Sequence, residues 1–296
     1  MIEIKGLCKS FKDKVVLKEI NLTIGDGKVL GLCGINGAGK STLLRIITGV
    51  YKADSGEVII DGENSFDNEK VKEKMYFLPD EPFYDLNSTP ESLVKLYQSM
   101  YTVDIDTYYK HIDHFKIPRG KKINKFSKGM KRQMFISIAF AIKPKYLILD
   151  EAFDGLDPLA RLYFKREIVD MVSDNNTTVI IASHSLRELE DICDSFAILD
   201  NNVIASSGEL YDSLEKIHKY QIAFKEKIEK DQFPKVYKSY HQDERVIKIV
   251  TTKTIEELKV DLESLNPVFI DELPVNFEEM FTAVIEEGGY LEWEIY

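Results

Sequence analysis

The stretch "GLCGINGAGKSTLL" (residues 31–44) decides the fold of this chain. It fits the pattern G-x-x-x-x-G-K-[ST] through Gly34, Gly39, Lys40 and Ser41, with an apolar run on either side. A glycine-rich loop between a strand and a helix turns its backbone N–H groups inward, and the helix adds the positive end of its dipole. Such a loop holds polyanionic phosphate with little reorganisation, so the stretch predicts a phosphate-binding site.

The pattern gives each polar residue of the loop a role. We expect Lys40 to reach the β- and γ-phosphates of a nucleoside triphosphate and Ser41 to place its hydroxyl on Mg²⁺. The flanking stretches "GKVLGLCG" and "KSTLLRIITGV" are typical of a buried strand and a helix, which is the context that the pattern requires. The other residues expected to contact the nucleotide are Gly34, Asn36, Gly37, Ala38, Gly39 and Thr42.

A second stretch, "YLILDE", supplies the carboxylates that such a site needs. Its apolar residues predict a buried strand whose end presents Asp150 and Glu151. In P-loop NTPases an Asp at such a strand end holds the Mg²⁺ that bridges the β- and γ-phosphates. Glu151 is then placed to orient or deprotonate the attacking water. A strand followed by an acidic turn is common, but together the two stretches predict a nucleoside triphosphatase.

Length and charge limit the remaining possibilities. The chain has 296 residues, which suggests about two domains. Its 50 acidic and 39 basic side chains give a net charge of -11, which opposes broad binding to nucleic acid or to an anionic membrane surface. The N-terminal residues do not have the pattern of a secretory signal, and no run of about 18 apolar residues predicts a membrane span. Scattered cysteines fit reduced thiols in a cytosol.

The sequence pattern divides the chain into regions. Residues 1–30 alternate like antiparallel strands, residues 82–143 are mostly helical, and the following strands and helices alternate as in a parallel sheet covered on both faces. The helix in "PESLVKLYQSMY" is expected to begin at a cap, Ser88 or Thr89. The pattern changes after about residue 208, so we predict a nucleotide-binding domain over 1–215 and a small α+β domain over 216–296.

Four further motifs carry a resemblance to a known family. "FSKGMKRQ", with Ser127 and Gly129, resembles the signature sequence of ABC transporter ATP-binding subunits. "DGLD", ending at Asp157, resembles the loop that crosses to the partner subunit. His184 in "SHS" matches the switch histidine, and Phe11 in "KSFKDKVVL" occupies the position of the aromatic that stacks on adenine. All these motifs stand in the family's order.

The resemblance, which covers roughly residues 1–215, implies an α/β fold with a RecA-like P-loop NTPase core. This core carries an N-terminal antiparallel β subdomain and an inserted helical subdomain, and the small C-terminal α+β domain follows it. The resemblance also implies a dimer of two copies, or of one copy and a related subunit. This dimer would hold two ATP molecules, each between the P-loop of one subunit and the signature of the other. His184 would hold the γ-phosphate. Hydrolysis with Mg²⁺ would drive a separate transmembrane permease, placing the chain in the cytoplasm at the inner face of the membrane.

Two residues depart from the family pattern. Asp80, in "FLPDEP", stands where Gln is usual, and its oxygen can still serve Mg²⁺ or water. Lys128 stands where Gly is common in the signature, while Gly129 still allows close approach of backbone to phosphate. Degenerate signatures in the family can mark a weak or silent site. Whether both sites of a dimer are active, and whether the dimer is made of like or unlike subunits, stays open.

Two groups of basic residues allow contrasting interpretations. Residues 119–132 hold seven basic side chains and no acidic one, which indicates either a positive rim facing the partner's ATP or a solvated helix face. His111 and His114 lie three apart on a predicted helix, and no acidic or Cys set accompanies them. We expect a surface or capping role for them rather than metal binding.

Three classes of function remain in competition. The motif "SKGM", Asp80 and the C-terminal "LPVNFEEMF" resemble ATPases of bacterial drug or antimicrobial-peptide exporters, which favours a transport ATPase. The alternative is a soluble ABC-family ATPase acting on ribosomes or DNA. The single P-loop, the net charge and the missing heptad insertion disfavour it. A signalling GTPase would need an N-K-x-D stretch, which is missing from the expected place.

Overall fold

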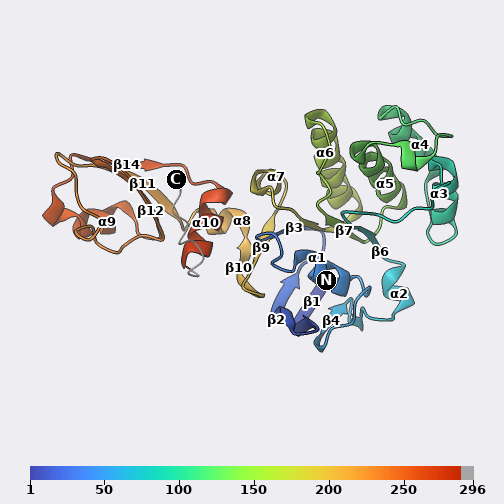
Figure 1. The fold of residues 1–296 in the computed structure, drawn as a ribbon, viewed down its shortest axis with the longest axis horizontal. Coiled ribbons are helices and arrows are strands. Elements are labelled where there is room, and N and C mark those ends of the chain that lie inside the picture. The colour runs from blue at the N-terminus through green and yellow to red at the C-terminus, as the bar shows by residue number, and fades with distance from the viewer. Residues whose placement is uncertain (288–296) are drawn as a thin grey trace. The chain divides into compact units, whose positions relative to one another are not determined.

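The computed structural model describes residues 1–287 and separates into two compact units, Met1–Ile204 and Ala205–Tyr296 (Figure 1). The division falls earlier than the boundary at residue 215 that the sequence pattern predicts. It lies inside strand β10 (Val203–Glu209), because the polypeptide leaves the first unit while still extended. Within the described residues, no helix combines the length and the apolar character needed to span a membrane.

An antiparallel sheet opens the first unit, as the alternation in residues 1–30 predicts. Its strands, in the spatial order β2-β1-β4-β5, are β2 (Lys14–Ile24), β1 (Ile2–Phe11), β4 (Ser55–Ile60) and β5 (Glu63–Asn64). One face of each long strand contributes aliphatic side chains to a core that also receives α1 (Lys40–Ile47). This sheet therefore lies against the helix that follows the P-loop (Figure 1).

A six-stranded sheet forms the centre of the unit, in the order β10-β9-β3-β8-β7-β6. Strands β3 (Val29–Cys33), β7 (Tyr146–Asp150) and β8 (Thr178–Ala182) are buried along their whole length and pair in parallel. The other strands are β6 (Met75–Leu78) and β9 (Ser195–Asp200). Because the carboxyl ends of parallel strands meet at one edge, the loops after β3, β6, β7 and β8 come together there.

Helices complete the unit. The helical lobe between β6 and β7 contains α3 (Pro90–Gln98), α4 (Ile105–His114), a 3₁₀ turn at Ile123–Lys125 and α5 (Lys128–Ile142). Helix α3 begins at the cap Thr89, which exchanges hydrogen bonds with Ser92 in a capping box, so one of the two predicted starts is confirmed. The remaining helices of this unit are α2 (Glu69–Lys72), α6 (Pro158–Asn175) and α7 (Leu186–Glu190), whereas α8 (Leu210–Leu214) already belongs to the second unit.

The expectation for His111 was wrong, because this histidine belongs to the core of the helical lobe. It is 1% exposed, and its Nδ1 lies 2.9 Å from the Tyr163 hydroxyl on α6. Burial, together with the charges of Lys110 and His114, lowers the pKa of His111 to about 4, so it is neutral at pH 7. His114 is exposed and stacks on the ring of Tyr163 at 4.2 Å.

The second unit is a four-stranded antiparallel sheet with helices, in the strand order β12-β13-β11-β14. Its core gathers aromatic and aliphatic residues such as Tyr220, Phe233 and Ile249. The sequence gives strand signals at "YQIAF", "RVIKIVTT" and "PVFIDEL", but "SYHQD" is too polar to give one, so β12 is not predicted. Its elements are β11 (His218–Ala223), β12 (Ser239–Asp243), β13 (Val246–Thr251), α9 (Ile255–Asp261), a 3₁₀ turn at Glu263–Leu265, β14 (Phe269–Leu273) and α10 (Phe277–Glu287).

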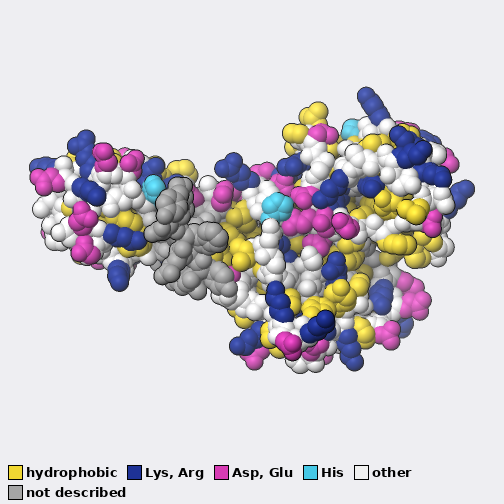
Figure 2. Space-filling view, viewed as in Figure 1, with side chains coloured by type: hydrophobic (Ala, Val, Ile, Leu, Met, Phe, Trp, Pro, Cys, Tyr) yellow, Lys and Arg dark blue, Asp and Glu magenta, His cyan; other side chains and the backbone are white. Residues whose placement is uncertain are grey.

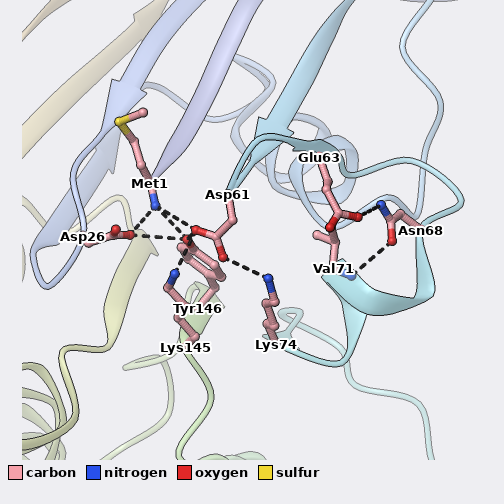
Figure 3. A network of polar contacts seen from close by, with 9 residues as sticks. All are labelled: Met1, Asp26, Asp61, Glu63, Asn68, Val71, Lys74, Lys145 and Tyr146. Carbon is pink, nitrogen blue, oxygen red and sulfur yellow. Dashed lines mark hydrogen bonds and ion pairs between the residues drawn. The ribbon is translucent and has the colours of Figure 1, made fainter.

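A polar network ties the antiparallel sheet to the start of β7 (Figure 3). Asp61, which follows β4, accepts hydrogen bonds from the Tyr146 hydroxyl at 2.6 Å, from Lys145 Nζ at 2.8 Å and from Lys74 Nζ at 3.1 Å. The amino group of Met1 reaches the same carboxylate at 3.3 Å. Since Tyr146 is the first residue of β7 and Asp150 the last, this network braces the end of the strand opposite the acidic pair.

We expect Asp61→Asn to lower the free energy of unfolding at pH 7 by about 1.5–3 kcal/mol, the range for hydrogen bonds to a charged group. Burial alone would raise the Asp61 pKa, but the hydrogen bonds from Lys145, Tyr146 and Lys74 outweigh it and hold the pKa well below its usual 3.8. The ionised form therefore stabilises the fold above pH ~4, and this contribution declines as the pH falls further. Urea unfolding at pH 7 and pH 3 checks the prediction. A difference between variant and wild type that is equal at both pH values would contradict it.

Candidate nucleotide-binding site

The P-loop lies between β3 and α1, where the sequence places it. Lys40, the first residue of α1, is 7% exposed, and its ammonium group donates to the carbonyl of Gly34 at 2.6 Å and of Ile35 at 3.4 Å. Burial lowers the pKa of Lys40, while the charges of Glu151 and Asp150 oppose that shift. The cation is thus held inside the loop and faces the two carboxylates at the end of β7.

Two glycines make the path of this loop possible. A Cβ at Gly34 would lie 2.4 Å from the carbonyl oxygen of Leu199, which leaves no room for a side chain. Gly39 has a φ of 111°, and a Cβ there would lie 3.0 Å from the carbonyl oxygen of Val16. Beside the loop is a cavity of about 410 Å³. It is lined by Val16, Asn36, Gly37, Ala38, Gly39, Lys40, Ser41, Thr42, Asp80 and Glu151.

Asp150 is the last residue of β7 and carries a buried carboxylate. It is 1% exposed, and neither of its oxygens has a hydrogen-bond partner among the described residues. Burial raises its pKa; the nearby Ser41 hydroxyl and Arg45 act in the opposite direction, and the negative charges of Glu151 and Asp80 add to the rise. An unpaired buried carboxylate next to a hydroxyl is an oxygen donor set that suits Mg²⁺. The residues present therefore fit the metal that the sequence predicts.

Glu151 and His184 meet at the same edge of the sheet. Glu151 has a φ of 49°, an uncommon conformation for this residue type, and its N–H donates to Ala182 at the end of β8 at 2.9 Å. Its Oε2 lies 2.8 Å from His184 Nδ1. The Glu151 side chain is 16% exposed and that of His184 is 54% exposed. The structure therefore brings a partly buried base into contact with a solvent-facing imidazole beside the cavity.

Six of the predicted residues do not line this cavity: Gly34, Asp150 and His184, whose contacts are given above, and Ser127, Gly129 and Phe11. Ser127 caps α5 by accepting a hydrogen bond from the N–H of Met130 at 3.1 Å, and Gly129 lies in the first turn of that helix. A Cβ at Gly129 would lie 2.4 Å from the carbonyl oxygen of Gly155, so α5 closely approaches the loop after β7. Phe11 is 43% exposed, and its ring meets Tyr51 edge-on with 5.6 Å between the centroids. Within this one chain, the signature and the aromatic stay outside the P-loop cavity.

The two departures from the family pattern prove to be in contact. Lys128 Nζ lies 3.3 Å from Asp80 Oδ1 and 3.6 Å from Asp154 Oδ2. Arg132, one turn further along α5, is 2% exposed and donates to Asp80 Oδ1 at 2.9 Å and to the Pro79 carbonyl at 2.9 Å. Arg132 is buried, so it fits neither of the two interpretations of the basic segment, a positive rim facing the partner's ATP or a solvated helix face. The sequence did contain a signal that Arg132 acts together with Lys128, because residues four apart lie on the same face of a helix.

The rest of the basic segment is divided among other partners. Arg119 pairs with Asp113, and Lys122 Nζ donates to Asn87 Oδ1 at 2.6 Å. Lys131 Nζ lies 5.1 Å from the centre of the Tyr84 ring. Charged side chains of both signs are intermixed over the face drawn in Figure 2. Arg119, Lys122 and Lys131 of the segment therefore make separate contacts with their own lobe.

Comparison with known proteins identifies the class. Residues 17–154 match the family described as "ABC transporter". The chain is 34% identical over 295 residues to the ABC transporter ATP-binding protein YtrB of Bacillus subtilis (strain 168), covering 99% of this chain and 100% of the relative. It is 32% identical over 232 residues to the lantibiotic transport ATP-binding protein SrtF of Streptococcus pyogenes, covering 77% of this chain and 100% of the relative.

Solved structures agree with the fold. A structure described as the ATP-binding subunit of an ABC transporter superposes with a TM-score of 0.66 at 28% identity, covering 73% of this chain and 92% of that one. A dimeric cassette bound to ADP and Pi gives a TM-score of 0.61 at 20% identity, covering 71% of this chain and 99% of that one.

The chain belongs to the ABC transporter ATP-binding proteins. It is an ATP-binding ATPase of the transport class, and its first unit has the P-loop NTPase fold that the resemblance implies. The expected fold class and the transport reading of the sequence are thereby confirmed.

Proposed function

We propose that this chain hydrolyses ATP with Mg²⁺ in the P-loop cavity, in a sandwich dimer that drives a transmembrane exporter. One observation carries the proposal. The buried, unpaired Asp150 lies at the same sheet edge as Lys40, Ser41 and the contact between Glu151 and His184. That arrangement supplies a phosphate cation, oxygen ligands for a metal and a base within one site.

The residues of the cavity divide the chemistry among them. The Lys40 ammonium and the loop N–H groups bind the phosphates, and Thr42 and Asn36 line their path. Asp150 and Ser41 would hold Mg²⁺, and Asp80 borders the same cavity. When bound, Mg²⁺ neutralises charge on the β- and γ-phosphates. Glu151 would take the proton of the attacking water, with His184 Nδ1 fixing the orientation of its carboxylate, and His184 would hold the γ-phosphate.

The second half of the site comes from a partner subunit. Ser127 and Gly129 lie outside the cavity of their own chain, which supports a contact with ATP on another subunit, alike or related. The loop at Asp157, whose side chain caps α6, would cross to that subunit, and the exposed ring of Phe11 would stack on adenine. All these residues lie in the first unit, and we assign the ATP chemistry to it.

The transport partner is inferred from the relatives. The name of SrtF refers to lantibiotic transport, which supports export of a related peptide or drug class by a permease that this chain serves. Through that permease the chain would sit at the inner face of the cell membrane, in the cytoplasm. We propose no nucleic-acid partner, in keeping with the net charge of -11.

Phosphate release from ATP tests the proposal. We expect the purified chain to hydrolyse ATP in MgCl₂, to lose at least 95% of that activity (about 20-fold) when EDTA removes the metal, and to regain it on re-addition, because charge on the phosphates must be neutralised for transfer. Activity that is insensitive to EDTA would contradict the metal assignment. Pull-down in mild detergent should recover a multispan membrane protein, whereas recovery of ribosomal proteins would favour the alternative function.

A further inference from the structure

One lysine connects three parts of the nucleotide site. Lys128 lies between Ser127 and Gly129, at the start of α5. Its ammonium group pairs with Asp80, in the loop after β6, and with Asp154, in the loop after β7. The N-terminus of α5 is thereby tied by a single cation to both loops.

The buried Arg132 anchors the loop that carries Asp80. Arg132 donates to the backbone carbonyls of Pro79 and Asp80 at 2.9 and 3.0 Å, as well as to the Asp80 carboxylate. Arg132 therefore holds both the backbone and the carboxylate of Asp80 beside Lys128. Arg132 also rules out a simple exchange of the two charges, since a lysine at position 80 would face its guanidinium group.

Asp80 lines both a cavity and a groove of the surface. One is the P-loop cavity, where it lies among the residues that include Lys40 and Glu151. The other is a groove of about 430 Å³ whose lining includes Asp80, Tyr84, Lys128 and Lys131. Asp80 therefore lies between the nucleotide cavity of this chain and the start of α5, where Ser127 and Gly129 lie.

We propose that Lys128, Asp80 and Asp154 form a charged latch that positions Ser127 and Gly129 relative to the chain's own nucleotide cavity. Lys128 is then a positioning residue, since it lies outside the cavity lining and acts through its neighbours. This inference rests on the proposed function, in which Ser127 and Gly129 meet ATP on the partner subunit. The latch makes their placement depend on the loops that surround ATP in their own chain.

A double-mutant cycle tests the latch through ATP turnover. We expect Lys128→Gln to lower kcat about tenfold in the wild-type background and at most about twofold in the Asp80→Asn background, because the nearer of the two partners of Lys128 is then already lost and only Asp154 remains. The KM for ATP and the thermal midpoint of Lys128→Gln should stay unchanged, since a half-exposed ion pair contributes little to stability. Lys128→Arg keeps the charge and should retain most of the activity.

Arg119→Gln is the matched control. Arg119 belongs to the same basic segment and pairs with Asp113 on the exposed surface of the same lobe, so the variant also removes one charge and one ion pair. Its kcat should equal that of the wild type. The latch is overturned if Lys128→Gln behaves like Arg119→Gln, or if it costs the same factor in both backgrounds. Absence of ATP turnover in the wild type would instead overturn the proposed function, and the latch with it.

Discussion

Glu151→Gln should slow ATP hydrolysis by roughly 10²- to 10⁴-fold, the usual contribution of a general base. The amide keeps the size of the side chain and can still contact His184, but it cannot take a proton from water. ATP binding should persist, because the phosphates are held by Lys40 and the loop rather than by the base. Single-turnover measurement of phosphate release gives the rate without interference from product release.

The same variant should trap the closed dimer, because in the proposed sandwich the γ-phosphate links Lys40 of one copy with Ser127 of the other. Size-exclusion chromatography with ATP and Mg²⁺ should show Glu151→Gln as a dimer and the wild type mainly as a monomer. Glu190→Gln makes the same substitution on α7, outside the cavity, and should match the wild type. Wild-type hydrolysis by Glu151→Gln would remove this residue from the mechanism. A persistent monomer would indicate that the partner is a different subunit.

Lys40→Ala should weaken ATP binding by at least about 10²-fold and abolish turnover. Lys40 is the only side-chain cation among the residues that line the cavity, and electrostatic stabilisation of phosphoryl charge is commonly worth several kcal/mol. The glycine-rich backbone would remain, so residual weak binding is expected. Binding of fluorescent ATP, measured by titration, gives the affinity directly.

Two comparisons separate loss of binding from loss of folding in this variant. Lys40 is buried and donates to Gly34, so the thermal midpoint of Lys40→Ala must be measured alongside its affinity. Lys18→Ala removes an exposed lysine from β2, two residues from the cavity residue Val16, and should bind ATP normally. If folded Lys40→Ala binds and hydrolyses ATP like the wild type, the P-loop assignment is wrong.

The site elements that the sequence alone determined are those whose cause is local. The glycine pattern predicts the loop, because Gly34 and Gly39 lie where the path of the backbone leaves no room for a side chain. Short unbroken apolar runs predict the buried strands β3 and β7. Once these strands were predicted to be parallel, their carboxyl ends had to meet at one edge of the sheet. That rule places Lys40, Ser41, Asp150 and Glu151 together without any knowledge of packing.

The tertiary structure alone decided the contacts between distant elements. Asp80 and Lys128 were two separate departures in the sequence, and only the packing of α5 against the loop after β6 makes them an ion pair. His111 depends in the same way on Tyr163 of α6, whose hydroxyl and ring contact it. Such contacts join residues far apart along the chain, and charge or periodicity within a short window carries no information about which side chain will lie opposite. The partners of these three residues therefore became visible only when the helices were placed on the sheet.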